Sequence, residues 1–277
     1  DALGSDLALK SNALQILACL TRSAFGKQKL IQKNTVDVLI SAVFSESKVI
    51  TVNAAEALAA ICADDAIVQS DLVSRGCLAP LKVMITSTDN AIKQSAFGLV
   101  SKLCEVPAND GAIEKEGLVH LAITNIPVCS AALHTVCMLS MRARFQRLIP
   151  ALGGLELLLE ASNSETTKVS RVAQLTLLNL ASLPENQQTV INKHGLDSLT
   201  ELIGDPDILL RRQVVNCMYR IVSNAIYQNN AFGVQFGTHK CLPILIQSAS
   251  DPDMEVACQA LAGLAVLCLD KEARLLL

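Results

Sequence analysis

The chain has 277 residues, 51% of them hydrophobic and only 3% aromatic, with no tryptophan and a formal net charge of −3. This composition predicts a core of Leu, Ala, Val and Ile in which helices pack closely. Broad nonspecific nucleic-acid binding requires an excess of Lys and Arg over acidic residues, which this chain does not have, so no nucleic-acid partner is expected.

Ten cysteines could indicate a disulfide scaffold or a metal site, but their placement argues against both. No Cys-x-x-Cys pair occurs. We expect reduced cysteines that act as small hydrophobic residues in the core of a cytosolic or cytosol-facing protein. Seven of them lie inside segments predicted to be helical: Cys19, Cys62, Cys104, Cys137, Cys217, Cys258 and Cys268.

An apolar helical pattern recurs along the chain at steps of 41, 42, 36, 41, 41 and 46 residues. Each occurrence has a long helix whose last turn carries an apolar residue, which we call the mark. One unit of this kind cannot bury its apolar face alone, so neighbours must stack and share a continuous core. The sequence therefore predicts a single elongated domain over 1–277. The marks are Leu20, Ile61, Leu103, Leu139, Leu180, Ile221 and Leu267.

Taken in chain order, each unit is predicted to begin with its long helix, at 7–20 in the first unit, where a later helix follows at 36–44. The third unit is short by about five residues, and Ile126-Pro127 predicts an abrupt turn after it. The seventh holds only its long helix and the start of the next. The predicted units are 6–47, 48–89, 90–125, 128–164, 168–207, 208–253 and 254–277.

The fifth unit is the most complete. Dense apolar periodicity predicts a long helix at 169–180, and Pro184 is placed to open a short helix. Gly195 then serves as a left-handed cap before a second amphipathic helix at 196–203. The same turn returns in the segments RGCLAPLKVMI, EGLVHLAI and GGLELLL.

These residues resemble the armadillo repeat family, whose unit joins an Asn-Leu helix end, a Pro-Glu-Asn turn and a Gly-Leu helix start. The resemblance covers nearly all of the chain. It implies an all-α, right-handed superhelical armadillo-repeat solenoid of about six to seven repeats, and a non-catalytic scaffold that recruits partner proteins through its concave groove. The best matches are Asn179-Leu180, Pro184-Glu185-Asn186 and Gly195-Leu196-Asp197-Ser198-Leu199.

Peptide-binding members of that family place Asn one residue before the mark and often Trp five before it. Here a single Asn and no Trp occupy these rows, which disfavours the way import adaptors hold basic peptides. The row one before the mark is Cys19, Ala60, Lys102, Met138, Asn179, Arg220 and Val266. The row five before it is Gln15, Glu56, Gly98, His134, Leu175, Asn216 and Ala262.

Adding the row nine before the mark predicts a polar cluster in the groove, centred on the fifth and sixth units. Arg binds carboxylates through two parallel hydrogen bonds and Asn can hold a peptide backbone, so we expect an acidic or mixed-polarity segment of another protein as the ligand. The alternative is that these charges only solvate a helix surface. The predicted groove residues are Lys102, His134, Arg171, Asn179, Arg212, Asn216 and Arg220.

The sixth unit contains an expanded segment between Ile221 and Cys241 with three aromatic residues, Tyr227, Phe232 and Phe236. They form either a second contact site for a partner, using large rings at low entropic cost, or filling for an enlarged turn.

No catalytic, metal or cofactor site is expected. The four histidines lie at unrelated repeat positions. His194 stands directly before Gly195, where a favourable interaction with the C-terminus of the predicted helix explains its presence. His134 has no acidic neighbour at helical spacing, and phosphate-loop and dinucleotide fingerprints are absent.

No apolar span long enough for a transmembrane helix and no signal peptide is visible, and the chain begins at Asp1 without Met. Its repeats also resemble the armadillo-repeats-only proteins of apicomplexan parasites. That resemblance implies a lipoprotein with an acylated N-terminal segment, which is absent here. The segment would tether the solenoid to the cytosolic face of rhoptries, and the solenoid would recruit motor or adaptor proteins there. The alternative is a soluble nuclear-transport-type peptide adaptor.

Overall fold

The computed structural model describes residues 2–20, 23–32, 35–192, 201–227 and 241–275. Within these ranges all regular structure is helical and no strand occurs, which confirms the all-α prediction. The chain divides into two compact units, Asp1–Leu139 and Ser140–Leu277, each described by itself below. The predicted Gly195 cap, His194, Phe232 and Phe236 lie outside the described residues.

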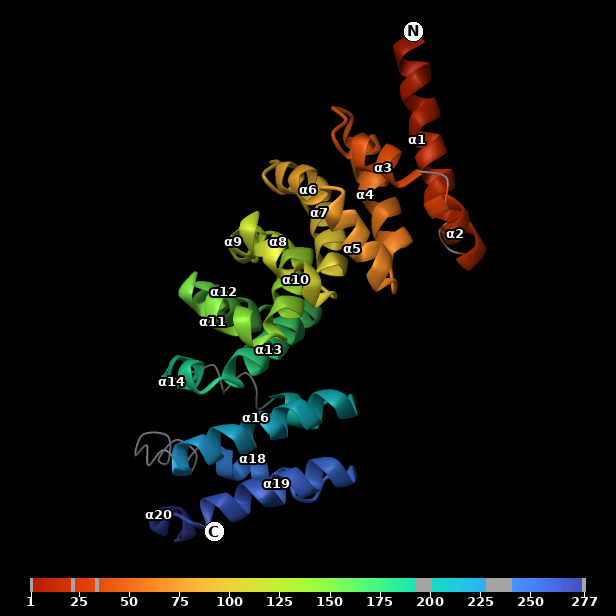
Figure 1. The fold of residues 1–277 in the computed structure, drawn as a ribbon. Helices are drawn as coiled ribbons and strands as arrows, with labels where there is room; N and C mark the ends of the chain where they lie inside the picture. Colours follow the sequence, from red (N-terminus) through yellow and green to blue (C-terminus); the bar gives the residue numbers. More distant parts are fainter. Residues whose placement is uncertain (1, 21–22, 33–34, 193–200, 228–240, 276–277) are drawn as a thin grey trace. The chain divides into compact units, whose positions relative to one another are not determined.

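Both units consist of short helices set between long ones, and the long helices of consecutive repeats pack together. Figure 1 shows α4 beside α7 in the N-terminal unit and α16 beside α19 in the C-terminal unit. The N-terminal unit contains α1 (Ala2–Leu20), α2 (Ala24–Gln32), α3 (Thr35–Val43), α4 (Lys48–Cys62), α5 (Ala66–Ser74), α6 (Leu78–Ile85), α7 (Asn90–Leu103), the 3-10 helix η1 (Pro107–Asn109), α8 (Asp110–Lys115), α9 (Leu118–Thr124) and α10 (Ser130–Ser140). The C-terminal unit contains α11 (Ala143–Ala151), α12 (Gly154–Ser162), α13 (Thr167–Ala181), α14 (Pro184–Asn192), the 3-10 helix η2 (Glu201–Gly204), α16 (Ile208–Tyr227), α18 (Leu242–Ser248), α19 (Met254–Leu267) and α20 (Lys271–Arg274).

The marks locate the core. Six of the seven are buried, as the repeat register predicts: Ile61, Leu103, Leu139, Leu180, Ile221 and Leu267. Leu20 is the exception, because 47% of it is exposed at the end of α1.

Several local predictions hold. Pro184 begins α14, and a hydrogen-bonded turn at 125–128 separates α9 from α10. The repeated turn holds glycines in the left-handed conformation, which is strained for any residue with a Cβ atom. They are Gly76, Gly117 and Gly153, with φ of 81°, 74° and 77°.

Other local predictions need correction. Of the predicted helix at 196–203, only the last residues are described, and they form part of η2. The α16 helix continues six residues past its mark, from Ile221 to Tyr227, into the segment predicted as an expanded loop. The helix continues there because Val222 and Ala225, three residues apart, extend its apolar face and are both buried.

All ten cysteines remain thiols, and all ten are among the described residues. Burial raises the pKa of Cys62 and Cys217 to about 12, which keeps these core thiols protonated. Cys19, Cys258 and Cys268 are exposed, so the expectation of a core role is wrong for these three. They lie on α1 and at α19, where the described residues provide no further repeat to cover them.

A buried amide closes the C-terminal end of successive long helices, where backbone carbonyls lack a partner inside the helix. In each case a side-chain N–H donates to the carbonyl six residues earlier, at the mark or directly after it. The pairs are Asn109 to Leu103 at 2.9 Å, Gln146 to Ser140 at 2.8 Å, Asn186 to Leu180 at 2.9 Å and Gln187 to Ala181 at 3.0 Å.

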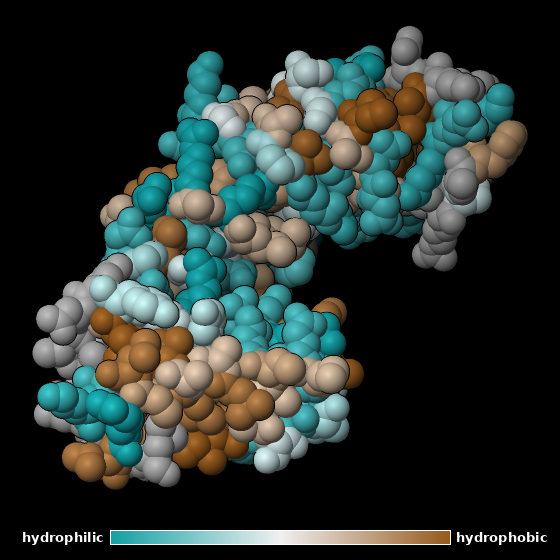
Figure 2. Space-filling model, turned by 60° about the horizontal axis from the view of Figure 1, so that its bottom comes forward, coloured by the Kyte–Doolittle hydropathy of each residue, from teal (hydrophilic) through white to brown (hydrophobic). Residues whose placement is uncertain are grey.

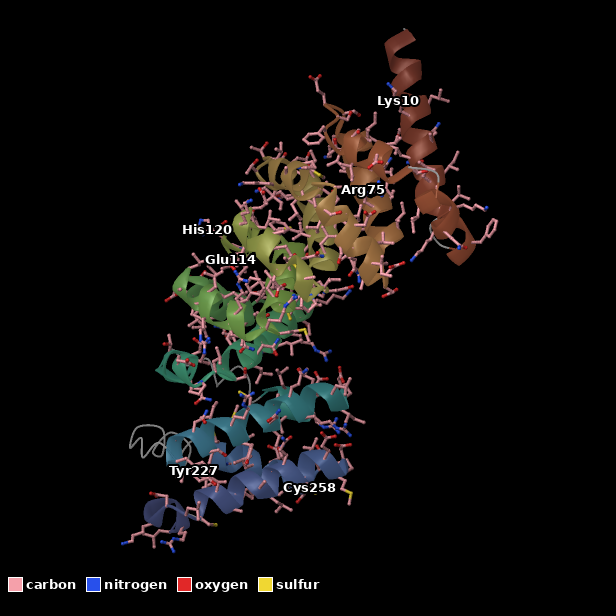
Figure 3. The ribbon with its side chains drawn as sticks, viewed as in Figure 1. Lys10, Arg75, Glu114, His120, Tyr227 and Cys258 are labelled. Atoms are coloured by element: carbon pink, nitrogen blue, oxygen red, sulfur yellow. The ribbon has the colours of Figure 1, made fainter. Side chains whose placement is uncertain are left out.

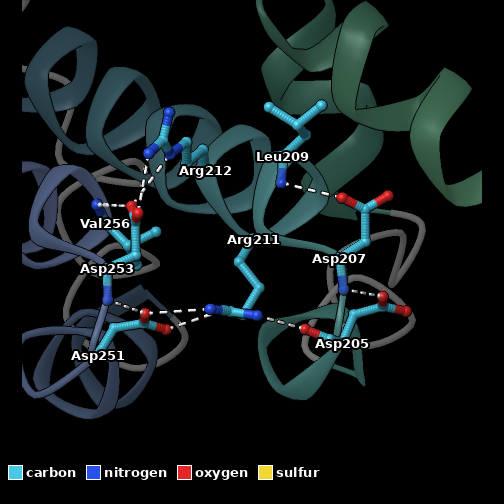
Figure 4. Close-up of polar contacts among 8 residues, drawn as sticks. All are labelled: Asp205, Asp207, Leu209, Arg211, Arg212, Asp251, Asp253 and Val256. Carbon is cyan, nitrogen blue, oxygen red and sulfur yellow. Dashed lines mark hydrogen bonds and ion pairs between the residues drawn. The ribbon is translucent and has the colours of Figure 1, made fainter.

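Ion pairs join consecutive repeats at the opposite end of the long helices. A basic residue near the start of one long helix bonds an aspartate in the turn before the next. Figure 4 shows two such pairs side by side, from Arg211 and Arg212 of α16. The pairs are Lys48 with Asp89 at 2.6 Å, Arg171 with Asp205 at 2.8 Å, Arg211 with Asp251 at 2.9 Å and Arg212 with Asp253 at 2.8 Å.

These pairs predict a loss of stability in acid. The hydrogen bond from Arg212 is the main cause that lowers the pKa of Asp253 from 3.8 to about 2. A carboxyl group with a depressed folded-state pKa stabilises the protein above its unfolded pKa, and this contribution is lost as the pH falls from about 4 to about 2.

We expect Asp253→Asn to reduce the acid sensitivity of the C-terminal unit, because asparagine can still cap the Val256 N–H but carries no charge. The measurement is the urea midpoint at about pH 6 and about pH 3. The fall between the two pH values should be smaller in the variant than in the parent chain, and an equal fall would contradict the assignment.

Candidate binding groove

The row five before the mark lies at the surface, whereas the row one before it includes the buried Val266. In the row five before the mark, all seven residues are described and none is buried; Gln15, Glu56, His134, Asn216 and Ala262 are exposed. Residues four apart share one helix face, so the rows one, five and nine before the mark form a strip along each long helix.

In the N-terminal unit this strip lines a groove between α4 and α7 with a volume of about 390 Å³. Its charged groups offset one another. The Lys102 ammonium lies 2.8 Å from the Glu105 carboxylate, whose hydrogen bond raises the pKa of Lys102. The lining residues are Val52, Glu56, Ala59, Ala91, Gln94, Ser95, Gly98 and Lys102.

His134 belongs to the same unit and lies on α10 with its side chain exposed. Desolvation by the surrounding helix surface is the main cause that lowers its pKa, and the positive charge of Lys102 adds to the effect. His134 is therefore neutral near pH 7 and can donate or accept a hydrogen bond there, but it carries no charge for an anion.

In the C-terminal unit a second groove of about 270 Å³ lies between α13 and α16. It brings together three of the predicted residues, Asn179 from α13 and Asn216 with Arg220 from α16. The Asn179 amide donates to the Ser140 hydroxyl at 3.0 Å, which fixes its orientation. The lining residues are Met141, Gln146, Leu178, Asn179, Ser182, Gln213, Asn216, Cys217 and Arg220.

Arg220 is the one charged residue among those that line the α13/α16 groove. Its side chain is exposed, and within the described part of the chain no carboxylate forms an ion pair with it. Asn216 stands one helical turn before Arg220 and is also exposed. The groove therefore presents an uncompensated guanidinium beside two amides.

The two other predicted arginines have partners inside the chain. Arg171 bonds Asp205, and Arg212 bonds both Asp253 and Glu255, the latter at 2.6 Å. Neither is among the residues that line the α13/α16 groove. Both carry the inter-repeat ion pairs described above, which accounts for their place near the start of a long helix.

The aromatic segment is only partly described. Tyr227 is the last residue of α16, and 72% of it is exposed (Figure 3). Its use as a contact site remains a prediction.

Sequence reasoning missed part of the α13/α16 groove. Gln213 and Cys217 lie eight and four residues before the mark of α16, each directly after a row that was predicted, so the rows next to the predicted ones could have identified them. Met141 and Ser182 each come directly after the last residue of a long helix, α10 and α13, where the 3.6-residue periodicity of the helix has ended; both stand two residues after a mark, so only the repeat register could have identified them.

Neither a metal-binding group of His, Cys, Asp and Glu nor a helix able to span a membrane is present in the described ranges.

No protein-family model and no curated protein matches the chain. Solved structures do. The crystal structure of an engineered protein from the Northeast Structural Genomics Consortium aligns with a TM-score of 0.83 at 20% identity, covering 96% of this chain and 66% of that one. This chain thus spans just under two thirds of that structure.

The arrangement of long and short helices and these structural matches define an armadillo-like helical-repeat solenoid. A designed armadillo repeat protein is among the similar structures, with a TM-score of 0.74 at 16% identity over 84% of this chain and 99% of the designed one. At such identities the similarity establishes the fold alone.

Proposed function

We propose that this protein is a non-catalytic interaction scaffold whose α13/α16 groove binds an acidic or mixed-polarity segment of a partner protein. The observation that carries the proposal is the exposed Arg220 beside Asn179 and Asn216, without a carboxylate partner among the described residues. The helical-repeat fold is consistent with such a scaffold.

The chemistry of the three side chains suits an extended acidic peptide. The Arg220 guanidinium can bind a carboxylate through two parallel hydrogen bonds. An asparagine amide both donates and accepts, so Asn216 can pair with a peptide backbone in the way a neighbouring strand would. Asn179 already donates to Ser140, and its amide oxygen is left to accept from a ligand.

The N-terminal groove is a poorer anion site. Glu56 adds a negative charge to its lining, and Glu105 neutralises Lys102. A basic peptide of the kind that import adaptors carry would meet Arg220 in the other groove and be repelled. These charges favour the scaffold over the nuclear-transport-type adaptor.

A tethered location remains part of the proposal on the strength of sequence resemblance only. An acylated N-terminal segment would hold the solenoid at the cytosolic face of an organelle membrane, such as the rhoptry, where a motor or adaptor protein is the partner. Mass spectrometry of the N-terminus of the native protein tests this, and an unmodified N-terminus would remove the tether.

The groove is tested with labelled peptides rich in glutamate and, separately, in lysine. We expect the acidic peptide to bind more tightly, and Arg220→Glu to weaken it by about tenfold or more because repulsion replaces attraction. Fluorescence anisotropy gives both affinities.

The matched control is Arg147→Glu, the same charge reversal on α11 outside the groove, where the side chain is 66% exposed. It should leave the affinity within about twofold. Equal loss in both variants, or tighter binding of the basic peptide, would count against the groove.

A further inference from the structure

A further groove lies at the edge of the N-terminal unit, at the end of the long helices opposite the marks. Its walls come from the chain at α3 and α6 and from the first turns of the long helices α4 and α7. Because α4 packs against α1 on one side and against α7 on the other, the groove lies inside the stack of repeats. We call it the edge groove. The residues that line it include Phe44, Glu46, Lys48, Thr51, Val83 and Met84.

The size of the edge groove indicates what it can hold. Its volume is about 260 Å³. Pockets that enclose a whole small molecule measure about 300–1,000 Å³. Thr51 and Met84 are buried, whereas Phe44 and Val83 are 62% and 65% exposed. The groove therefore suits side chains that project from a protein segment, which Phe44 and Val83 are free to contact.

The two exposed apolar side chains stand where other repeats carry polar ones. The third helices of four units share a register, since each has a buried leucine in its middle: Leu39, Leu81, Leu158 and Leu245. Five residues after this leucine the first unit has Phe44, and the other three have Thr86, Asn163 and Ser250. Two residues after it the second unit has Val83, and the other three have Ser41, Glu160 and Gln247. All eight of these residues are exposed.

The fold thus exposes both positions in every one of these units, and the core needs no apolar residue at either. Scattered exposed apolar residues are ordinary on a protein surface, and Figure 2 shows apolar side chains in patches among hydrophilic surface. Phe44 and Val83 differ from scattered residues because they line one groove, although they come from two repeats. Apolar side chains that gather in this way are typical of contact sites for other proteins.

The charge of the edge groove comes from Glu46. The Lys48 ammonium lies 2.6 Å from the Asp89 carboxylate, and the Thr51 hydroxyl donates to the Ser45 carbonyl at 2.9 Å. These groups are therefore satisfied inside the chain. Glu46 is exposed, and no ion pair involves its carboxylate in the part of the chain that the structure describes. The groove presents one uncompensated negative charge beside two apolar side chains.

We propose that the edge groove binds a segment of another protein in which a large apolar side chain stands next to a lysine or arginine. The apolar side chain packs between Phe44 and Val83, and the cation pairs with Glu46. This ligand is opposite in charge to the one proposed for the α13/α16 groove. The two grooves therefore select different segments and do not compete for one ligand.

Three labelled peptides test the chemistry of the ligand by fluorescence anisotropy. The first alternates leucine with lysine, the second has serine in place of leucine, and the third has glutamine in place of lysine. We expect the first to bind at least about tenfold more tightly than either of the others, because the groove uses both an apolar side chain and a cation. Equal affinity of the first peptide and either of the others overturns the proposal.

Three variants locate the binding site. Phe44→Thr and Val83→Ser each introduce a residue that another unit carries at the same position, so the fold is kept, which circular dichroism checks. Each should weaken binding of the leucine-lysine peptide about fivefold or more. Glu46→Lys should weaken it about tenfold at low salt, and this effect alone should shrink at about 1 M salt, where exposed charges are screened.

Val128→Ser and Glu165→Lys are the matched controls, because they make the same changes at exposed residues that do not line the edge groove. Both should leave the affinity for the leucine-lysine peptide within about twofold of the parent chain. The proposal is overturned if the groove variants bind this peptide like the parent chain, or if the controls lose as much affinity as the groove variants.

Discussion

Replacing Phe97 with alanine should lower the free energy of unfolding of the N-terminal unit by about 3–5 kcal/mol. The ring is fully buried on α7, and the Phe97 carbonyl accepts a hydrogen bond from Thr135 of the following repeat. Truncation removes the transfer free energy of the ring and leaves a cavity that close-packed helices cannot fill. Urea unfolding followed by circular dichroism measures the change.

Phe25→Ala is the matched control, because the same ring on α2 is 71% exposed, with the Lys29 ammonium 5.7 Å from its centroid. Its effect should stay below about 1 kcal/mol. Similar losses in the two variants would show that Phe97 is not a core residue.

Replacing Asn186 with alanine should cost about 2–4 kcal/mol in the C-terminal unit. The buried Asn186 amide donates to the Gln146 carbonyl at 2.7 Å and to the Leu180 carbonyl at 2.9 Å. Removing it strands two buried acceptors, one of which belongs to the preceding repeat. The loss should appear as a lower urea midpoint for this unit.

The control for Asn186 is Asn163→Ala. Asn163 also donates to a backbone carbonyl, that of Leu159 at 3.2 Å, but at an exposed site where water replaces the lost bond. We expect a change of at most about 0.5 kcal/mol. If both variants unfold at the same midpoint, the buried amide does not hold the two repeats together.

Much of the fold could be predicted from the sequence because the repeat imposes one pattern many times. A mark such as Leu180 is buried in the interior of the unit, and its position follows from helical periodicity together with the repeat length. The pattern fails at Leu20 and Leu261, since periodicity reports an apolar face but not whether a neighbour covers it.

The candidate groove was predicted in part. Register alone placed Asn179, Asn216 and Arg220 on adjoining helix faces, and they line one groove. It could not tell Arg220 from Arg212, because the difference is a bond to Asp253, 41 residues away. Which arginine is available to a partner depends on the turn before the next repeat.

The sequence by itself determined the helical class, the repeat length and the surface on which each polar row lies, because these follow from local periodicity and the need to bury an apolar stripe. Tertiary structure decided which charges neutralise one another, which amides close helix ends and which apolar faces stay open. Those outcomes depend on side chains about forty residues apart meeting across a repeat junction, and contacts between repeats exist only once the helices have stacked.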